Sequence, residues 1–325
     1  MTDYPDDAAL AAGLATVLDD ADCRTGSVAF HRRQVNEYAR TFPSELVDYD
    51  RAGGDIGRLF CKYMTVLPDD HRDHGSRGGV PYEAMVYERA LVGLELTLPT
   101  FRGLARDPAT GSAWLVLDHV ADAVDLDLSE DESALVRAAD WLGRFHATLA
   151  HRFAGARPSG LTVYDAAYYQ GWARRAEEFA GSWFGEFPWL VGFAERFEGA
   201  IALLVAAEPT LVHGEFYPHN ILVRADGIYP VDWESAAIGA GEIDLVTLSD
   251  GWPADDIAAC DAAYTRARWP GSAPADLTQT TAAARLFNQV RWLGSNPSWT
   301  AHADARWRVV DLGTAAAALG WPVST

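Results

Sequence analysis

Lysine is almost absent from this chain of 325 residues. Of its 26 basic residues only Lys62 is a lysine, and the other 25 are arginines. The codon bias of a GC-rich genome would explain the arginines, but it does not explain the one lysine that remains. Because a compact ammonium group and a planar guanidinium bind phosphate differently, we interpret Lys62 as a candidate phosphate-binding residue.

Cysteine and long apolar segments are also scarce. The three cysteines, at positions 23, 61 and 260, are widely spaced and match neither a disulfide framework nor a metal site. This usage is typical of a reducing cytoplasm. No run of about 18 apolar residues predicts a membrane-spanning helix, and the acidic N-terminus lacks the basic-then-apolar order of a signal peptide. We expect a cytoplasmic protein without a membrane partner.

Positive charge is in deficit, and the formal net charge is −20. Surfaces that follow nucleic-acid phosphates need clustered lysine and arginine, so we expect no nucleic-acid partner. A negative field favours cationic ligands, although many proteins are acidic only for solubility. The length suits one large domain or two lobes with separate cores.

The first part of the chain has the pattern of a small antiparallel sheet that carries one main helix. Short apolar segments are separated by turn-forming residues, and residues 51–55 are a hairpin signal. An N-terminal helix is expected over residues 1–22. The expected strands are residues 27–34, 45–49, 57–65, 98–104 and 113–120, and the main helix is residues 82–91.

The rest of the chain is mainly helical. A capping box at residues 129–132 predicts the start of a long amphipathic helix. Further helices are expected at residues 163–180, 190–207, 253–268, 279–293 and 303–319, and two short strands at 221–223 and 228–231. The predicted class is therefore α+β with two lobes, residues 1–120 and residues 121–325.

The richest motif is TLVHGEFYPHNILV at residues 210–223, followed by IYPVDWE at 228–234. It places Glu215 and Asn220 on a short loop and Asp232 at the end of a strand. Phosphoryl transfer needs one carboxylate to orient an attacking hydroxyl, and an amide with a second carboxylate to hold Mg²⁺ on a nucleotide. The alternative is a β-hairpin with incidental polar residues.

Lys62 lies in an apolar segment, and a helix with acidic residues follows about twenty positions later. A glutamate that pairs with the lysine would fix its ammonium group beside nucleotide phosphates. Glu83 is favoured over Glu88 because it falls in the first turn, near the strands. The alternative is that Lys62 is a solvated residue of an edge strand.

The loop at residues 36–44 contains no glycine. Its backbone N–H groups and the hydroxyl of Thr41 or Ser44 are candidates for phosphate contact, and a plain hairpin turn is the alternative. His213 is interpreted as a brace for the loop that carries Glu215, and His146 as a buried core residue. For His219 no role follows.

Aromatic and acidic residues alternate at positions 177–198, and a second group lies at Trp292, Asn296, Trp299 and Asp304. Aromatic faces with carboxylates suit a bound ammonium group. Such spacing also suits ordinary helix packing, and both interpretations stay open.

With these motifs in order, residues 25–315 resemble the aminoglycoside phosphotransferase and choline kinase superfamily, whose fold is like that of protein kinases. The resemblance is firm over residues 212–244 and rests on the His-Gly-acid-x-x-x-x-Asn pattern. By position it implies a catalytic Glu215, metal ligands Asn220 and Asp232, a structural Asp244, the Lys62–Glu83 pair, and an adenine-binding hinge at Asp118, His119 and Val120.

The main departure from the superfamily is Glu215, because aspartate is usual at that position. Glutamate reaches roughly 1.5 Å further, a distance that matters where orientation supplies the rate. Either the loop accommodates the longer side chain, which we favour, or the chain is a catalytically silent relative that binds a nucleotide. A protein kinase is disfavoured because the His-Arg-Asp and Asp-Phe-Gly motifs are lacking.

The resemblance implies an enzyme that uses ATP or GTP with Mg²⁺, bound between the lobes, to phosphorylate a hydroxyl of a small molecule. An antibiotic acceptor is favoured, with a cationic aminoglycoside as the leading example and a role in resistance. The alternative acceptors are metabolites such as choline-like amino alcohols, homoserine or sugars. Either a monomer or a dimer is compatible with the sequence.

Overall fold

The computed structural model describes residues 4–18, 28–37, 42–51, 54–64, 78–107, 109–155 and 158–323. The chain divides into two compact units. The first unit joins Met1–Leu128 to Asn220–Ser235, and the second joins Ser129–His219 to Ala236–Thr325. The sequence had suggested a single boundary after residue 120, so the return of residues 220–235 to the first unit differs from that expectation.

A five-stranded antiparallel sheet forms the first unit's main layer, in the order β1-β2-β3-β5-β4. Central strand β3 carries Lys62, which pairs with Ser44 on one side and Leu115 on the other. Each expected strand of this region is present with shifted ends. The strands are β1 Phe30–Val35, β2 Ser44–Asp50, β3 Ile56–Tyr63, β4 Phe101–Arg106 and β5 Ala113–Asp118.

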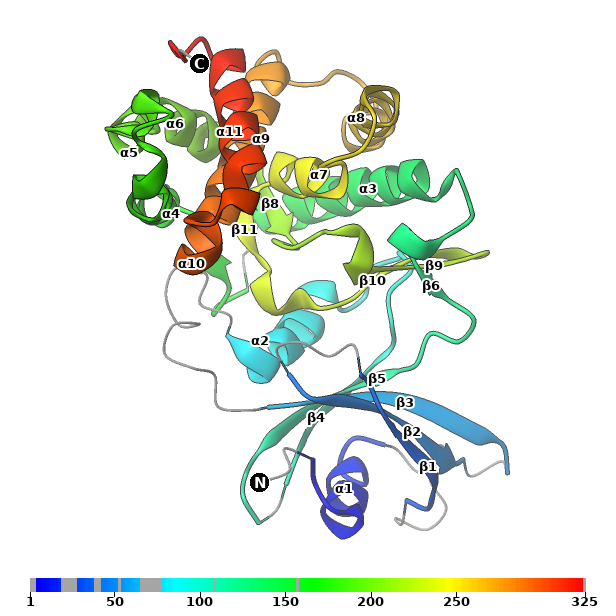
Figure 1. The fold of residues 1–325 in the computed structure, drawn as a ribbon. Helices are drawn as coiled ribbons and strands as arrows, with labels where there is room; N and C mark the ends of the chain where they lie inside the picture. The colour runs from blue at the N-terminus through cyan, green and yellow to red at the C-terminus, as the bar shows by residue number, and fades with distance from the viewer. Residues whose placement is uncertain are drawn as a thin grey trace. The chain divides into compact units, whose positions relative to one another are not determined.

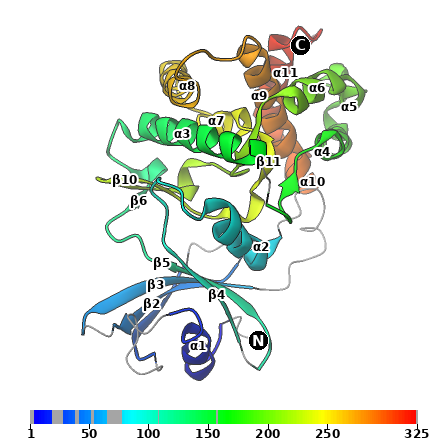
Figure 2. The ribbon, with the colours of Figure 1, turned by 180° about the vertical axis from the view of Figure 1, so that it is seen from behind.

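Two helices lie on opposite faces of this sheet, as Figures 1 and 2 show. Helix α1 (Asp7–Leu14) begins at the capping carboxylate of Asp6 and buries its leucines in a core with Tyr63 and Trp114. Helix α2 (Gly79–Val86) packs against β4 and β5 and continues as a π-helical turn, Tyr87–Leu91. The expected main helix therefore begins three residues earlier than predicted.

A smaller sheet explains why residues 220–235 belong to the first unit. The hairpin of β9 (Ile221–Arg224) and β10 (Gly227–Pro230) extends strand β6 (Val124–Asp125), giving the order β10-β9-β6. The side chain of Thr97 also donates to the carbonyl oxygen of Ile228 at 2.6 Å. Strand pairing between segments far apart in the sequence leaves no local signal, so one cut in the chain could not describe it.

The second unit is a helical bundle built around α9, which contacts α4, α6, α7 and α11. Figure 1 shows α9 (orange) beside α11 (red). No described helix is long and apolar enough to cross a membrane. The helices are α3 Ala134–Gly155, α4 Ala166–Phe179, α5 Phe193–Arg196, α6 Glu198–Ala206, α7 Glu242–Leu248, α8 Ala254–Arg268, α9 Leu277–Ser295, α10 Pro297–Thr300 and α11 Arg306–Ala318.

Helix α3 begins later than the capping box predicted. Its first helical residue is Ala134, and the N–H of Ser133 donates to the carboxylate of Asp131 at 2.9 Å. Asp131, rather than Ser129, therefore supplies the side-chain acceptor next to the helix. The expected apolar face is present, and Leu142, Phe145 and Leu149 are fully buried.

The aromatic residues of segment 177–198 pack in or against the core, and Trp183, Phe184 and Trp189 are partly buried against it. Phe187, Phe193 and Phe197 are at most 5% exposed. The carboxylate of Glu177 accepts hydrogen bonds from the N–H groups of Gly192 and Ala194. Gly192 is left-handed, with φ of 72°, and helix α5 begins only after it. The single helix expected over residues 190–207 therefore starts later, and it divides at Phe197 into α5 and α6. Packing accounts for these side chains better than cation binding does.

A three-stranded sheet leads into the loop that carries Glu215. Strand β11 (Ala237–Ala240) pairs in parallel with β7 (Thr162–Val163) and antiparallel with β8 (Pro209–Val212). All four residues of β11 are buried. The loop begins directly after β8, so its first residue, His213, is anchored by a buried strand.

Candidate active site

Lys62 lies at the centre of a buried ionic cluster in the first unit. Its Nζ donates to Glu83 Oε2 at 2.7 Å and to Asp232 Oδ1 at 2.6 Å, and lies 3.7 Å from Glu234 Oε2. Glu83 and Glu234 are each 1% exposed, whereas Glu88 lies on the exposed side of its helix. The glutamate expected beside Lys62 is thus Glu83, and Lys62 is not a solvated edge residue.

The charges of this cluster do not balance among its own side chains. Burial alone would lower the pKa of Lys62, but the carboxylates of Glu83, Asp232 and Glu234 outweigh it and raise that pKa. Burial raises the pKa of Glu83, an effect that the ammonium group opposes. One ammonium group facing three carboxylates leaves an excess of negative charge, which suits a divalent cation.

Asp232 is held in an uncommon backbone conformation, two residues after β10 ends at Pro230. Its φ is 69°, in the left-handed region that residues with a side chain rarely adopt. The next N–H, of Trp233, donates to Glu83 Oε1 at 3.2 Å. The turn therefore ties the position of Asp232 to the glutamate of α2. Such conformations concentrate at functional sites.

Asn220 is brought next to this turn by the β9–β10 hairpin. Its carbonyl oxygen accepts from the N–H of Val231 at 2.9 Å, which extends the ladder one step beyond the Ile221–Pro230 pair. An amide oxygen and carboxylate oxygens are the ligand types that Mg²⁺ takes. The donor set of Asn220 and Asp232 therefore fits this ion. Glu234 is a further nearby acid that sequence reasoning missed, although it stood in the quoted Asp-Trp-Glu tripeptide.

The loop that carries Glu215 belongs to the second unit, and a buried carboxylate holds its backbone. Asp244 of α7 accepts from the N–H of His213 at 2.5 Å and from the N–H of Gly214 at 2.9 Å. His213 Nδ1 accepts from the N–H of Glu215 at 3.3 Å. His213 is thus a brace, as expected, and Asp244 is structural within this unit.

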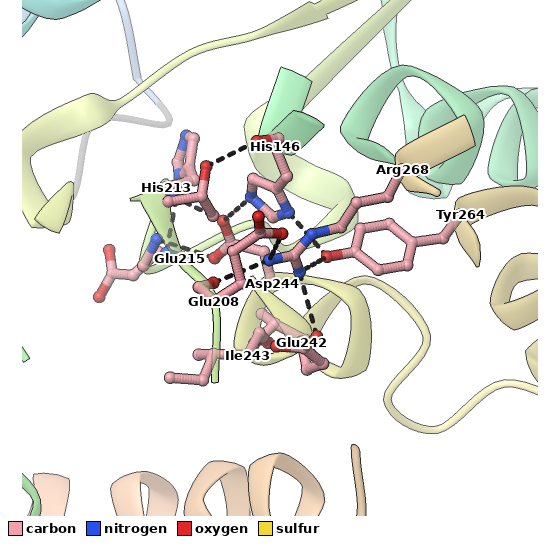
Figure 3. Close-up of polar contacts among 12 residues, drawn as sticks. His146, Glu208, His213, Glu215, Glu242, Ile243, Asp244, Tyr264 and Arg268 are labelled. Carbon is pink, nitrogen blue, oxygen red and sulfur yellow. Dashed lines mark hydrogen bonds and ion pairs between the residues drawn. The ribbon is translucent and has the colours of Figure 1, made fainter. Parts of the chain in front are cut away.

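Asp244 is the end of a longer polar chain, which Figure 3 shows. His146 Nε2 lies 3.3 Å from Asp244, and its Nδ1 lies 2.9 Å from the hydroxyl of Tyr264. Arg268 donates to that hydroxyl and to Glu242. A neutral imidazole that donates from Nε2 and accepts at Nδ1 satisfies every contact. The sequence predicted that His146 is a satisfied core residue, but it did not predict this series of hydrogen bonds.

Burial controls the charge of His146. It lowers the pKa of the imidazole to about 4, although the hydrogen bond with Asp244 opposes the shift. The ring is therefore neutral near pH 7, and Arg268 carries the positive charge at the far end of the chain.

The expected hinge residues lie at the end of β5. The N–H of Asp118 donates to the Thr100 carbonyl at 2.9 Å, and the N–H of His119 donates to the Arg58 carbonyl at 3.0 Å. The Asp118 carboxylate pairs with Arg102 at 2.7 Å. Two of the N–H groups expected to meet adenine are therefore already bonded to neighbouring backbone.

The phosphate-loop candidates are only partly described. Thr41 lies outside the described residues. Ser44 is buried on β2, and its hydroxyl accepts from the Asn36 side chain at 3.1 Å. This pairing is typical of a hairpin that closes on itself, so nothing here favours Ser44 as a phosphate ligand.

The second aromatic and acidic group is occupied by the protein's own side chains. The Arg308 guanidinium lies 4.7 Å from the ring centre of Trp292. Asn296 caps α10 by accepting from the N–H of Trp299. Asp304 lies 3.2 Å from the His302 ring. A face of Trp292 that already carries a cation argues against ammonium binding there.

Comparison with solved structures identifies the fold. Three of them, each 16% identical to the chain, have TM-scores of 0.55. The match with a GDP complex of aminoglycoside 2'-phosphotransferase-IIIa covers 90% of this chain and 93% of the phosphotransferase chain. A choline/ethanolamine kinase family protein from Mesorhizobium loti covers 98% and 95%. Macrolide 2'-phosphotransferase type I covers 94% and 98%. The expected α+β, protein-kinase-like fold is confirmed.

Sequence comparison identifies the family. No curated protein matches the chain by sequence. The profile of the phosphotransferase enzyme family (APH), however, matches residues 66–278, well over half of the chain. That span includes the loop after β8, the β9–β10 hairpin and α7. The chain therefore belongs to the phosphotransferase enzyme family.

Proposed function

We propose that this protein transfers the γ-phosphoryl group of ATP or GTP to a hydroxyl group of a small molecule. The observation that carries the proposal is the buried cluster in which Lys62 contacts Glu83 and Asp232. Burying more carboxylates than one ammonium group can balance is costly unless a cation completes the site. A divalent cation, bound together with a nucleotide phosphate, would supply the positive charge that balances these carboxylates.

Each residue of the cluster has a proposed role. The ammonium of Lys62 binds nucleotide phosphate, and Glu83 orients that ammonium. Asn220 and Asp232 would hold Mg²⁺, which neutralises charge on the transferred phosphoryl group when bound. The left-handed backbone of Asp232 fixes the direction of its carboxylate in advance. Backbone groups of the segment from Asp118 to Val120 are proposed to contact the nucleotide base, together with Thr41 at the phosphates.

Glu215 is the proposed catalytic carboxylate. It accepts a hydrogen bond from the acceptor hydroxyl and aligns its oxygen for in-line attack on the γ-phosphorus. Asp244 and His146 keep the loop backbone in place, so that the carboxylate is oriented before the acceptor binds. Because the phosphoryl transition state is loose, positioning contributes more than proton removal.

The proposed acceptor class is an antibiotic or a related natural product, with cationic aminoglycosides first. The net charge of −20 supports a cation. Two of the solved structures named above are aminoglycoside and macrolide phosphotransferases. A metabolite kinase is the second candidate, because the choline/ethanolamine kinase family protein is as similar in fold and spans 98% of the chain.

The test is turnover with Mg²⁺ and ATP or GTP against aminoglycosides, macrolides, nucleoside antibiotics, choline and homoserine. We expect one acceptor class to gain about 80 Da, one phosphoryl group, by mass spectrometry. Nucleotide binding without transfer to any acceptor or to water would instead establish a silent nucleotide-binding relative.

Asp232→Asn tests the metal assignment in the same assay. We expect kcat to fall on the order of 100-fold to 1,000-fold, because a carboxylate that stabilises developing charge is lost. The matched control is Asp226→Asn in the turn of the same hairpin, where the carboxylate is exposed and pairs with Arg224. Near-normal turnover by Asp232→Asn would refute the metal role.

A further inference from the structure

Arg291 is a buried cation in contact with the loop that carries Glu215. It lies on α9 and is 9% exposed. Its Nη1 donates to the carbonyl oxygen of Gly214, and its Nη2 lies 3.7 Å from Glu215 Oε1. Arg291 and the loop that carries Glu215 both lie in the second unit. No motif or spacing in the sequence pointed to Arg291.

The environment of Arg291 keeps it charged and directs it toward the loop. Burial alone would lower the pKa of its guanidinium, but neighbouring Tyr217, Tyr168, Tyr164 and Glu215 raise it overall. The carboxylate of Glu215 is one of the groups that stabilise this charge.

The ion pair is shielded from solvent. The side chains of Arg291 and Glu215 are 10% and 14% exposed. Salt screens such a pair much less than an exposed one, and removing one partner leaves the other charge buried. At 3.7 Å the two groups attract electrostatically, which restrains the direction of the carboxylate without closing a short hydrogen bond.

Gly214 is held from both sides. Asp244 accepts its N–H at 2.9 Å, and Arg291 donates to its carbonyl oxygen. Its φ is 84°, a conformation that glycine adopts without strain. The two peptide groups that flank Gly214 are thus fixed by an acid of α7 and a cation of α9.

We propose that Arg291 is the positioning residue for Glu215 and that it is the reason a glutamate serves at this position. The proposal rests on the proposed function. The guanidinium attracts Oε1 of Glu215 and thereby restrains the direction of the carboxylate that meets the acceptor hydroxyl. A side chain one methylene shorter would withdraw by roughly 1.5 Å from this partner and lose the restraint.

A double-mutant cycle tests the proposal, with Arg291→Met, Glu215→Gln and the double variant of the full-length protein. We expect Arg291→Met to lower kcat on the order of tenfold to 100-fold, because misplacement of an orienting group is costly. The KM for nucleotide should stay within about twofold. In the Glu215→Gln background, Arg291→Met should cause little further loss, because there is no carboxylate left to orient.

Two further variants make the cycle specific. Arg291→Lys keeps the charge and should restore part of kcat, which also covers the case in which Arg291→Met folds poorly. Arg285→Met is the matched control on the same helix, because Arg285 pairs with Asp261 in a partly exposed position. It should leave kcat unchanged.

The outcomes separate this proposal from the function beneath it. Equal losses from Arg291→Met in both backgrounds would make Arg291 merely structural, and a raised nucleotide KM would make it a phosphate ligand. Either result overturns the proposal while wild-type turnover stands. A wild-type protein that transfers phosphate neither to an acceptor nor to water would overturn the proposed function itself.

Discussion

At the residue scale, buried charges of opposite sign face one another at several places in the chain. Lys62 faces Glu83, Arg268 faces Glu242, and Arg291 faces the loop of Glu215. Each buried ion is costly without its partner. Such pairs favour one arrangement of side chains, which is what a site that orients a hydroxyl requires.

The substitution Glu215→Asp measures the value of the longer acid. We expect kcat to fall on the order of 100-fold, because the shorter side chain withdraws from Arg291 by roughly 1.5 Å. The same substitution in an Arg291→Met background should cost clearly less. Steady-state rates of the four proteins give the comparison, and a Glu215→Asp rate equal to wild type would show that glutamate is no specific adaptation.

Sequence reasoning reached some of these residues and not others, for a physical reason. Lys62 stood out because it is the single lysine, and Glu83 because helical geometry placed it beside the strands. Glu215, Asn220 and the acid after the second strand stood out because one short motif holds them. Arg291 is one arginine among 25, on a helix far along the chain, and only tertiary packing brings it to the loop.

At the element scale, long periodic helices and the strands of the β9–β10 hairpin were predictable, whereas strand β11 was not. Helix α9 was expected at residues 279–293 and spans Leu277–Ser295. Strand β11 was missed, because its sequence, AIGA, contains small residues with little intrinsic β-propensity. Pairing with β7 and β8 supplies what the local sequence lacks.

The contact between α3 and α7 predicts a specific pH dependence of stability. Folding lowers the pKa of His146 from 6.5 to about 4, so the folded state favours the neutral ring. The contribution of the neutral His146 ring to the free energy of unfolding is complete above pH 6.5 and is lost as the pH falls toward 4. We expect the free energy of unfolding to decrease there by up to about 1.4 kcal/mol per pH unit from this residue.

Urea unfolding of wild type and His146→Asn between pH 7 and pH 4 checks this expectation. The variant should be less stable at pH 7, because its contacts with Asp244 and Tyr264 are altered, and the difference from wild type should narrow toward pH 4. His151→Asn, at an exposed position of the same helix, is the control. A constant difference between wild type and His146→Asn would contradict the argument.

At the scale of the whole molecule, the division into units could not be read along the chain. The boundary expected after residue 120 followed the change from strands to helices. The β9–β10 hairpin then rejoins the first unit through β6, while the loop that precedes it stays with the helices. The motif that looked continuous in sequence thus supplies Glu215 to one unit and Asp232 to the other.

The net charge of −20 acts on any ligand that approaches, and it yields a prediction about the acceptor. A cationic acceptor is attracted by this field, and salt screens the attraction over about 10 Å at 0.1 M. We expect the KM of a cationic acceptor such as an aminoglycoside to rise several-fold between roughly 0.05 M and 0.5 M salt, because the Debye length shortens over that range.

A neutral acceptor offers the control, because its KM should change little over the same range of salt. Measured at saturating nucleotide, kcat should also stay nearly constant for both acceptors, since the charged groups of the cluster are buried and weakly screened. A KM that is independent of salt for the cationic acceptor would mean that the acidity of this chain serves solubility alone. The acceptor class would then have to be argued from contacts in the second unit rather than from charge.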